Sequence, residues 1–103
     1  MTFEIVLAPE AAKSLRKLRA HIRAEVRDAI EVHLRHEPAK VSKSRIKRLR
    51  GLSQPQFRLR VGDIRVFYDV TETAVEVLAI IEKAEAQAWL DEEGTPAPGG
   101  GPL

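Results

Sequence analysis

Residues 57–68 constrain the fold of this 103-residue chain more than any other segment. They read FRLRVGDIRVFY, in which apolar and basic residues alternate on both sides of a Gly62-Asp63 pair. A two-residue connection of this type between alternating segments is typical of a β-hairpin. We therefore expect antiparallel strands over residues 56–61 and 64–70, in a register that places Phe57 opposite Tyr68.

Side-chain alternation divides this hairpin into two chemically different faces. One face is apolar and contains Phe57, Leu59, Val61, Ile64, Val66 and Tyr68. The other face contains one aromatic residue and three arginines: Phe67, Arg58, Arg60 and Arg65. Like charges opposite each other destabilise a sheet by up to ~1 kcal/mol. Three arginines on one face therefore predict a bound anion, and RNA is the first candidate.

The remaining segments predict one small α+β domain. Alternation over residues 2–7 indicates a first strand. Pro9 suits the first turn of a short helix, and apolar spacing over residues 20–36 indicates a second helix that forms a hairpin with the first. Residues 75–81 are apolar enough on both faces for a strand inside the sheet. A short helix is expected to follow from about Lys83 to Glu93, with Ala84, Ala88 and Trp89 or Leu90 facing inward.

Two segments lack clear periodicity. Residues 39–55 form a basic connector, and such a length without regular structure is often functional in a compact domain. Gly94 is a suitable residue to end the last helix. We therefore expect the domain to span residues 1–94 and the Pro- and Gly-rich residues 95–103 to be disordered.

Charge is distributed unevenly along the chain. Residues 13–65 hold 16 of the 17 Lys and Arg residues against five acids, whereas residues 66–103 hold one Lys against eight acids. A basic module of this kind attracts nucleic acid or an acidic protein, although a solvated loop could have the same composition. The candidate RNA-binding residues are Arg45, Lys47, Arg48, Arg50, Arg60 and Phe67.

Several classes of site and location are not indicated by the sequence. Cysteine is absent, so no disulfide or thiolate is available. The three histidines do not have a recognisable ligand spacing, and we expect neither a metal nor a cofactor. Residues 1–4 lack a basic segment followed by a long apolar run, so no signal peptide is expected. No apolar run approaches the ~20 residues of a membrane span, and we expect a cytoplasmic protein with no membrane partner.

The order of the predicted elements is similar to that of a known family. The order is an N-terminal strand, a helical hairpin, a basic connector, a three-strand antiparallel meander and a short C-terminal helix. Together with KRLRGL at residues 47–52 and the hairpin at residues 57–68, it resembles the RelE/ParE superfamily of type II toxins over about residues 2–82. The RelE branch, which we favour, implies a metal-independent, ribosome-dependent endoribonuclease that cuts mRNA. The implied partners are the ribosome, mRNA and a cognate antitoxin, in a possible toxin-antitoxin hetero-oligomer.

The resemblance also implies catalytic residues. In the RelE branch the ribose 2′-OH attacks the neighbouring phosphate, which requires stabilisation of phosphorane charge and two proton transfers. Arg58 and Arg65 match basic positions of the family, and a planar guanidinium suits phosphate oxygens. RelE nucleases usually carry Arg and then Tyr or His after the last strand of the meander. This chain has only Lys83 as a cation there, and Lys83 is the candidate replacement.

Two other functions stay open. ParE-like members inhibit DNA gyrase and lack the nuclease residues, as this chain partly does. A non-catalytic member would use the basic surface only to hold RNA or an acidic antitoxin. Phe67 also has two interpretations, because it could stack on a base or fill a second small core.

Overall fold

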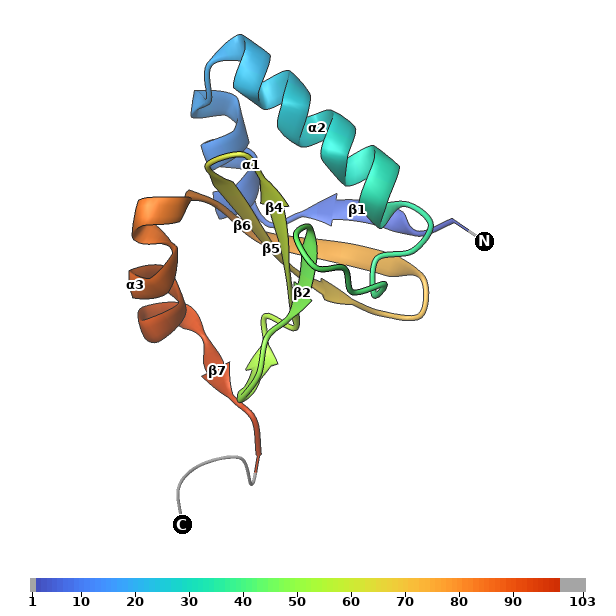
Figure 1. Cartoon of the computed structure of the whole chain (residues 1–103), viewed down its shortest axis with the longest axis vertical. Helices are drawn as coiled ribbons and strands as arrows, with labels where there is room; N and C mark the ends of the chain where they lie inside the picture. Colours follow the sequence, from blue (N-terminus) through green and yellow to red (C-terminus); the bar gives the residue numbers. More distant parts are fainter. Residues whose placement is uncertain (1, 99–103) are drawn as a thin grey trace.

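The computed structural model describes residues 2–98 and contains a sheet with helices against both faces (Figure 1). In chain order the elements are β1 (Glu4–Leu7), α1 (Pro9–Lys17), α2 (Ala20–Leu34), β2 (Ile46–Arg48), β3 (Leu52–Gln54), β4 (Phe57–Val61), β5 (Ile64–Val70), β6 (Ala74–Glu82), α3 (Lys83–Glu93) and β7 (Thr95–Pro96). Within residues 2–98, no helix has the length and apolar character needed to cross a membrane.

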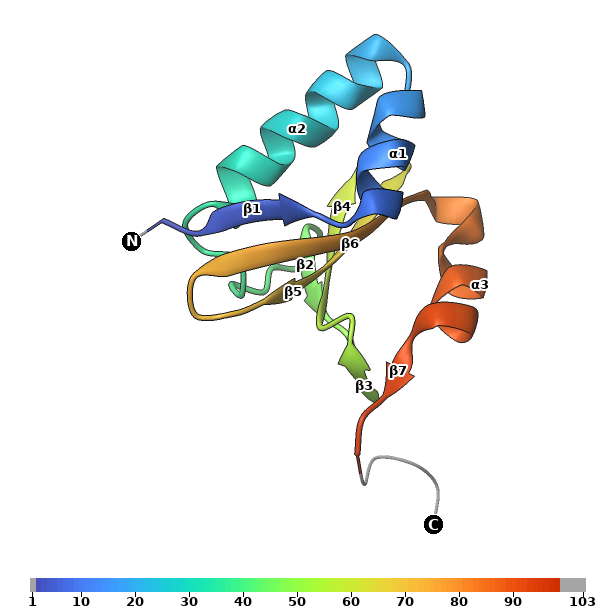
Figure 2. The ribbon, with the colours of Figure 1, turned by 180° about the vertical axis from the view of Figure 1, so that it is seen from behind.

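The main sheet has five strands in the order β1-β6-β5-β4-β2. Strands β4, β5 and β6 form an antiparallel meander, and β1 pairs with β6 in parallel. Strand β2 completes the other edge, antiparallel to β4. A separate two-stranded sheet pairs β3 with β7 below the main sheet, where both lie beside each other in Figure 2. The predicted α+β class and the predicted meander are confirmed.

The register of the β4–β5 hairpin is the predicted one. Val61 pairs with Ile64, Arg60 with Arg65, and Phe57 with Tyr68. Gly62 has a φ of +57° in the turn, a conformation that glycine adopts without steric cost. The apolar face of the hairpin packs against α1 and α2 in the main core, which also contains Ala11, Leu15, Val26, Ile30 and Leu34.

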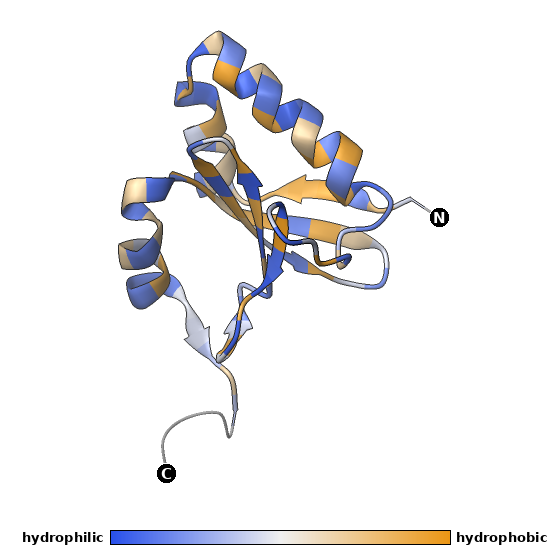
Figure 3. Cartoon of the chain, in the orientation of Figure 1, coloured by the Kyte–Doolittle hydropathy of each residue, from blue (hydrophilic) through white to orange (hydrophobic). Residues whose placement is uncertain are grey.

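A bulge in β6 changes which of its residues enter the main core. The pairing of β5 with β6 shifts between Phe67 and Tyr68, which leaves Leu78 as the extra residue. Val77 and Ile80 therefore both belong to the main core although they are three positions apart. Ala79 and Ile81 lie opposite Phe67 and Arg65. In Figure 3, apolar segments alternate with hydrophilic ones along the central strands.

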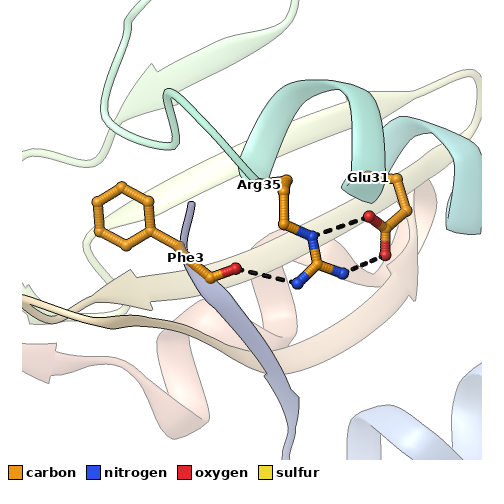
Figure 4. Close-up of polar contacts among 3 residues, drawn as sticks. All are labelled: Phe3, Glu31 and Arg35. Carbon is orange, nitrogen blue, oxygen red and sulfur yellow. Dashed lines mark hydrogen bonds and ion pairs between the residues drawn. The ribbon is translucent and has the colours of Figure 1, made fainter. Parts of the chain in front are cut away.

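The N-terminal segment is attached to the end of α2 through Arg35 (Figure 4). The Arg35 Nη1 atom donates to the Phe3 carbonyl at 3.0 Å, and Nε donates to the Glu31 carboxylate at 2.9 Å. The hydrogen-bonded guanidinium of Arg35 lowers the pKa of Glu31 below its usual value. The backbone N–H of Phe3 also donates to the Arg35 carbonyl at 2.7 Å. The Glu31–Arg35 pair thus lies where it fixes β1 next to α2.

Two sequence expectations about irregular segments were wrong. Residues 39–55 are not wholly irregular, because they contain β2 and β3. Residues 95–98 are not a free tail, because Thr95–Pro96 form β7 and the Ala97 N–H donates to the Gly51 carbonyl at 3.0 Å. The strands in both segments are short, and each pairs with residues elsewhere in the chain. The rest of the predicted tail, residues 99–103, lies outside the described residues.

The connector after α2 is anchored by a buried hydrogen bond. Tyr68 has no exposed surface, and its hydroxyl donates to the Pro38 carbonyl at 2.6 Å. Burial raises the pKa of Tyr68 well above its usual value, so the hydroxyl stays protonated as the donor. This bond connects the centre of the sheet to the segment that leads into β2.

We expect the Tyr68→Phe variant to fold with a free energy of unfolding lower by about 1–3 kcal/mol, because the buried Pro38 carbonyl loses its donor. Urea denaturation followed by circular dichroism measures the difference. The ring itself is retained, so the slope of the transition should not change. A variant within about 0.3 kcal/mol of the wild type would show that water replaces the hydroxyl.

Candidate functional site

Four cations lie on the face of the sheet opposite the main core. We call this set, Lys47, Arg58, Arg60 and Arg65, the basic face. Lys47 pairs with Arg58 across β2 and β4, and Arg60 pairs with Arg65 across β4 and β5. Lys47 and Arg60 are exposed, Arg58 is half-buried and Arg65 is only 7% exposed. The structure therefore brings the three hairpin arginines together as predicted and adds Lys47 beside them.

Arg58 is the least satisfied member of the basic face. Its Nε atom is buried and has no hydrogen-bond partner among residues 2–98. Burial lowers the pKa of Arg58, and the charges of Arg65 and Arg60 lower it further. A buried donor without a partner costs about 1–3 kcal/mol. An anion at this position would satisfy the Nε–H and neutralise the mutual repulsion of the three arginines.

Arg65 is bonded to the hairpin turn. Its Nη1 atom donates to the Gly62 carbonyl at 2.8 Å and to the Ile64 carbonyl at 3.1 Å. These bonds support the turn, and the charge of Arg65 acts on Arg58. The phosphate-holding role expected for Arg65 stays a prediction.

Phe67 is not available to stack on a base. It is only 1% exposed, and its ring stacks on Trp89 of α3 with centroids 5.1 Å apart and an angle of 13° between the planes. The assignment of Phe67 to RNA binding is therefore wrong, and the alternative of a second small core is confirmed. This stack places α3 against the same face of the sheet as the arginines. Of the α3 residues expected to face inward, Trp89 and Leu90 are half-buried, whereas Ala84 and Ala88 are exposed.

A groove lies between the β2–β3 segment and α3. Its volume is about 630 Å³, and it is lined by Lys47, Leu49, Arg50, Leu52, Gln87, Leu90 and Asp91. Lys47 belongs to both the basic face and the groove, so a bound chain could contact both. The residues from α3 were not predicted. Their helical spacing of three and four was visible in the sequence, but nothing there showed that α3 folds back toward β2.

The other predicted residues are dispersed. Arg45 lies in a separate hollow at the end of α2. The Arg48 guanidinium lies over the ring of Phe57, 5.0 Å from its centroid, and so on the core side of β2. Lys83 borders another hollow with Asp63 and Glu82, and its backbone N–H donates to the Asp63 carbonyl at 2.7 Å. Lys83 therefore does not line the groove with Lys47, and its expected catalytic role stays a prediction.

Asp69 supports the strand that carries Arg58 and Arg60, and the sequence did not predict this role. Its buried carboxylate accepts hydrogen bonds from the Gln54 Nε2 atom and from the Gln56 N–H, both at 2.7 Å. The Gln56 side-chain oxygen in turn accepts from the Val70 N–H at 2.8 Å. These bonds fix the corner between β3 and β4, two residues before Arg58. A single Asp at the end of a strand carries no sequence signal for this arrangement.

The basic face, as defined by its four residues, contains no His or Tyr. Tyr68 is in the main core with its hydroxyl bonded to Pro38. His21 and His33 belong to α2, and His36 follows that helix. Among the described residues, no cluster of three or more His, Cys, Asp or Glu side chains could hold a metal ion. The basic face can therefore bind and stabilise negative charge but has no His or Tyr as acid or base.

The fold and this face define a small α+β domain with a cationic sheet surface, and comparison with known proteins identifies its family. The family model described as ParE toxin of the type II toxin-antitoxin system, parDE, matches residues 5–87. The chain belongs to this family and is a toxin of a type II toxin-antitoxin system within the RelE/ParE superfamily. A search of curated proteins found no match.

Solved structures of similar fold are RelE-type proteins. An archaeal RelE–RelB complex from Pyrococcus horikoshii has a TM-score of 0.66 and 23% identity, covering 81% of this chain and 97% of that one. A double arginine-to-alanine mutant of E. coli RelE in the free state has a TM-score of 0.65 and 25% identity, covering 89% of this chain and 94% of that one. A RelBE toxin-antitoxin complex from Mycobacterium tuberculosis has a TM-score of 0.60 and 26% identity, covering 80% of this chain and 99% of that one.

We expect the Arg58→Met variant to be more stable than the wild type, by roughly 1 kcal/mol. Methionine keeps an apolar stem of similar length but removes the unpartnered Nε and the repulsion from Arg60 and Arg65. Urea denaturation at low salt measures the gain. The matched control is Arg60→Met, an exposed position on the same strand that should change stability by less than about 0.5 kcal/mol. A destabilised Arg58→Met variant would contradict this account of the basic face.

We expect the Trp89→Ala variant to loosen α3 without unfolding the sheet, because no residue of α3 is fully buried and the Phe67 stack is its main aromatic contact. The free energy of unfolding should fall by about 1–2 kcal/mol. Amide hydrogen exchange should accelerate in residues 83–93 but not in β5. The exposed Glu92→Gln variant serves as the control. Unchanged exchange in α3 would show that other contacts hold the helix.

Proposed function

We propose that this toxin binds RNA on its basic face and cleaves mRNA on the ribosome, which inhibits translation. The observation that carries the proposal is the buried Arg58 Nε–H, which has no partner within residues 2–98 and lies among other cations. A phosphate oxygen is the acceptor that matches both its hydrogen-bond requirement and its charge. Lys47 and Arg60 are exposed beside it and can contact the neighbouring phosphates.

The proposed reaction is a transesterification that requires no metal or cofactor. The 2′-oxygen attacks the adjacent phosphorus and loses its proton, the bond to the 5′-oxygen breaks, and that oxygen gains a proton. The products are a 2′,3′-cyclic phosphate and a 5′-hydroxyl. Arg58 and Arg60 stabilise the negative charge that develops on the phosphorane. Because the basic face lacks His and Tyr, we infer that the ribosome supplies the groups for proton transfer, which makes cleavage ribosome-dependent.

We further propose that a cognate antitoxin binds this toxin and neutralises it, in the cytoplasm where the ribosome is found. Support comes from the similar solved structures, two of which are RelE–RelB or RelBE complexes. The groove beside the basic face has apolar side chains, Leu49, Leu52 and Leu90, between Lys47 and Arg50 on one side and Asp91 on the other. A partner segment with apolar and acidic side chains fits this lining, and it would compete with RNA for Lys47.

The second candidate is inhibition of DNA gyrase in the manner of ParE. The match of the ParE toxin family model to residues 5–87 favours it. The lack of His and Tyr on the basic face is also consistent with a toxin that does not cleave RNA. In that case the basic face would bind the antitoxin or a nucleic acid without chemistry.

We expect the wild type to cut mRNA in a translating extract, with cut sites mapped by primer extension, and not to cut the same RNA without ribosomes. Arg58→Ala should slow cleavage by about a hundredfold, since it removes a donor to the phosphorane. The control Arg27→Ala should retain cleavage within about threefold, because Arg27 is an exposed residue of α2 and does not belong to the basic face. Lys83→Ala tests the catalytic role expected of Lys83, which predicts slower cleavage.

The same preparations separate the two candidates. Gyrase supercoiling assays with the wild type should show no inhibition and no trapped cleavage complexes if the toxin is a nuclease. Trapped complexes without mRNA cuts would establish the second candidate. Neither activity, together with stable antitoxin binding, would indicate a non-catalytic member.

A further inference from the structure

A second basic hollow lies where the chain leaves α2 and approaches β2, in the loop drawn in green in Figure 1. Its volume is about 280 Å³, and none of its lining residues belongs to the groove beside α3. The polar residues that line it are His33, His36, Glu37, Lys40, Ser42 and Arg45. Five of these six can donate hydrogen bonds to a ligand through their side chains when the imidazoles are protonated or in the suitable tautomer.

Ser42 gives this hollow a fixed donor. Its Oγ atom accepts hydrogen bonds from the backbone N–H groups of Arg45 and Ile46, both at 3.1 Å. A hydroxyl has two lone pairs, and both are occupied here, so its proton remains available to donate. The Ser42 N–H also donates to the Ile46 carbonyl at 3.0 Å, which closes the turn. The turn therefore holds Ser42 and the start of the Arg45 side chain next to each other.

The charge of the hollow is positive. Its one acid, Glu37, lies 3.6 Å from Lys40 in an exposed pair. Arg45 forms no salt bridge within residues 2–98 and its charge is uncompensated there. The carbonyls of the turn after α2 are directed to other donors. The Arg35, Glu37 and Pro38 carbonyls accept from Phe3, Lys40 and Tyr68. These bonds reduce the negative character that the end of a helix would otherwise have.

His33 adds a titratable donor to the hollow. Burial lowers its pKa, and the charge of Arg45 lowers it further. The charged and titratable groups that face it are His36 and Glu37 after α2, Lys40 in the next turn, and Arg45 before β2. An anion in the hollow would offset the repulsion between Arg45 and a protonated His33. Binding of an anion should therefore be accompanied by proton uptake at His33 and become tighter as the pH falls.

We propose that His33, His36, Lys40, Ser42 and Arg45 form a second phosphate-binding site, which takes one backbone phosphodiester of the RNA strand. The hollow is large enough for a single phosphate group and its sugar linkages. Exposed cations connect it to the basic face, since Arg45 precedes the edge strand β2 and Lys47 lies within it. The choice of RNA over a small phosphorylated molecule rests on the proposed function.

The test uses the full chain and two probes. Dimethyl phosphate is a phosphodiester whose charge stays constant between about pH 6 and pH 7.5, so any pH dependence belongs to the protein. A short 2′-O-methyl RNA supplies the same group in a strand that cannot undergo transesterification. Imidazole resonances of the three histidines, followed by NMR at constant ionic strength, report the pKa of each ring and the affinity of each probe.

We expect dimethyl phosphate to raise the pKa of His33, to leave that of His21 unchanged, and to bind more tightly near pH 6 than near pH 7.5. The RNA should bind more tightly than dimethyl phosphate and compete with it. Arg45→Gln should weaken both probes about tenfold, through loss of a charged donor. The control, Arg27→Gln, removes an exposed charge from α2 outside the hollow and should stay within about twofold.

Two results would overturn the site: no change in His33 with either probe, or wild-type affinity of the Arg45→Gln variant. Tighter binding of dimethyl phosphate than of RNA would overturn the assignment to an RNA strand. Failure of the proposed nuclease function can be distinguished from failure of this binding site. Absence of mRNA cleavage, with intact binding at His33, would reject the nuclease and keep this site. Two results together would reject this site and keep the nuclease. The Arg45→Gln variant would reach half-maximal cleavage at the same ribosome concentration as the wild type, and neither probe would change the pKa of His33.

Discussion

Burial of one face of the β4–β5 hairpin holds the structure together. Leu59, Val66 and Tyr68 have no exposed surface, and they join both helices of the N-terminal hairpin to the centre of the sheet. Because side chains alternate strictly along a strand, this burial assigns Arg58 and Arg60 to the opposite face. A register shift by one residue would exchange the two faces and put arginines into the core. The positive charge on the second face is therefore imposed by the same contacts that stabilise the fold.

The positive charge on the second face opposes folding at Arg58, and hydrogen bonds of neighbouring residues offset this effect. The unpartnered Arg58 Nε opposes folding, whereas the bonds from Arg65 to the turn and from Asp69 to the β3–β4 corner support it. Sites that bind a ligand commonly carry such unsatisfied groups, because the ligand completes them. The stack of Phe67 on Trp89 limits how much of this face stays open. The result is a narrow strip of accessible cations beside the groove, set into an otherwise packed surface.

The parts of the fold that the sequence predicted are those with a strong local period. The alternation around Gly62 defined the hairpin and its register, and the spacing of apolar residues defined α1, α2 and the start of α3. The parts that failed depend on partners far along the chain. Phe67 is buried because Trp89 returns to it, β3 exists because β7 pairs with it, and the bulge at Leu78 has no sequence signature. Within the site, the grouping of the arginines was predictable, whereas the burial of Arg65 was not.

The basic and acidic residues that are separated along the chain are also separated in space beside the groove. Lys47 and Arg50 lie on one side of the groove, whereas Asp91 and the exposed Glu85, Glu92 and Glu93 belong to α3 on the other side. The charges on the two sides of the groove therefore form a local dipole directed across it. In the field of a large polyanion this dipole experiences a torque that turns the basic strands toward the polyanion and α3 away from it. Orientation would thus begin at distances comparable to the Debye length, ~8 Å at physiological ionic strength, before any contact is made.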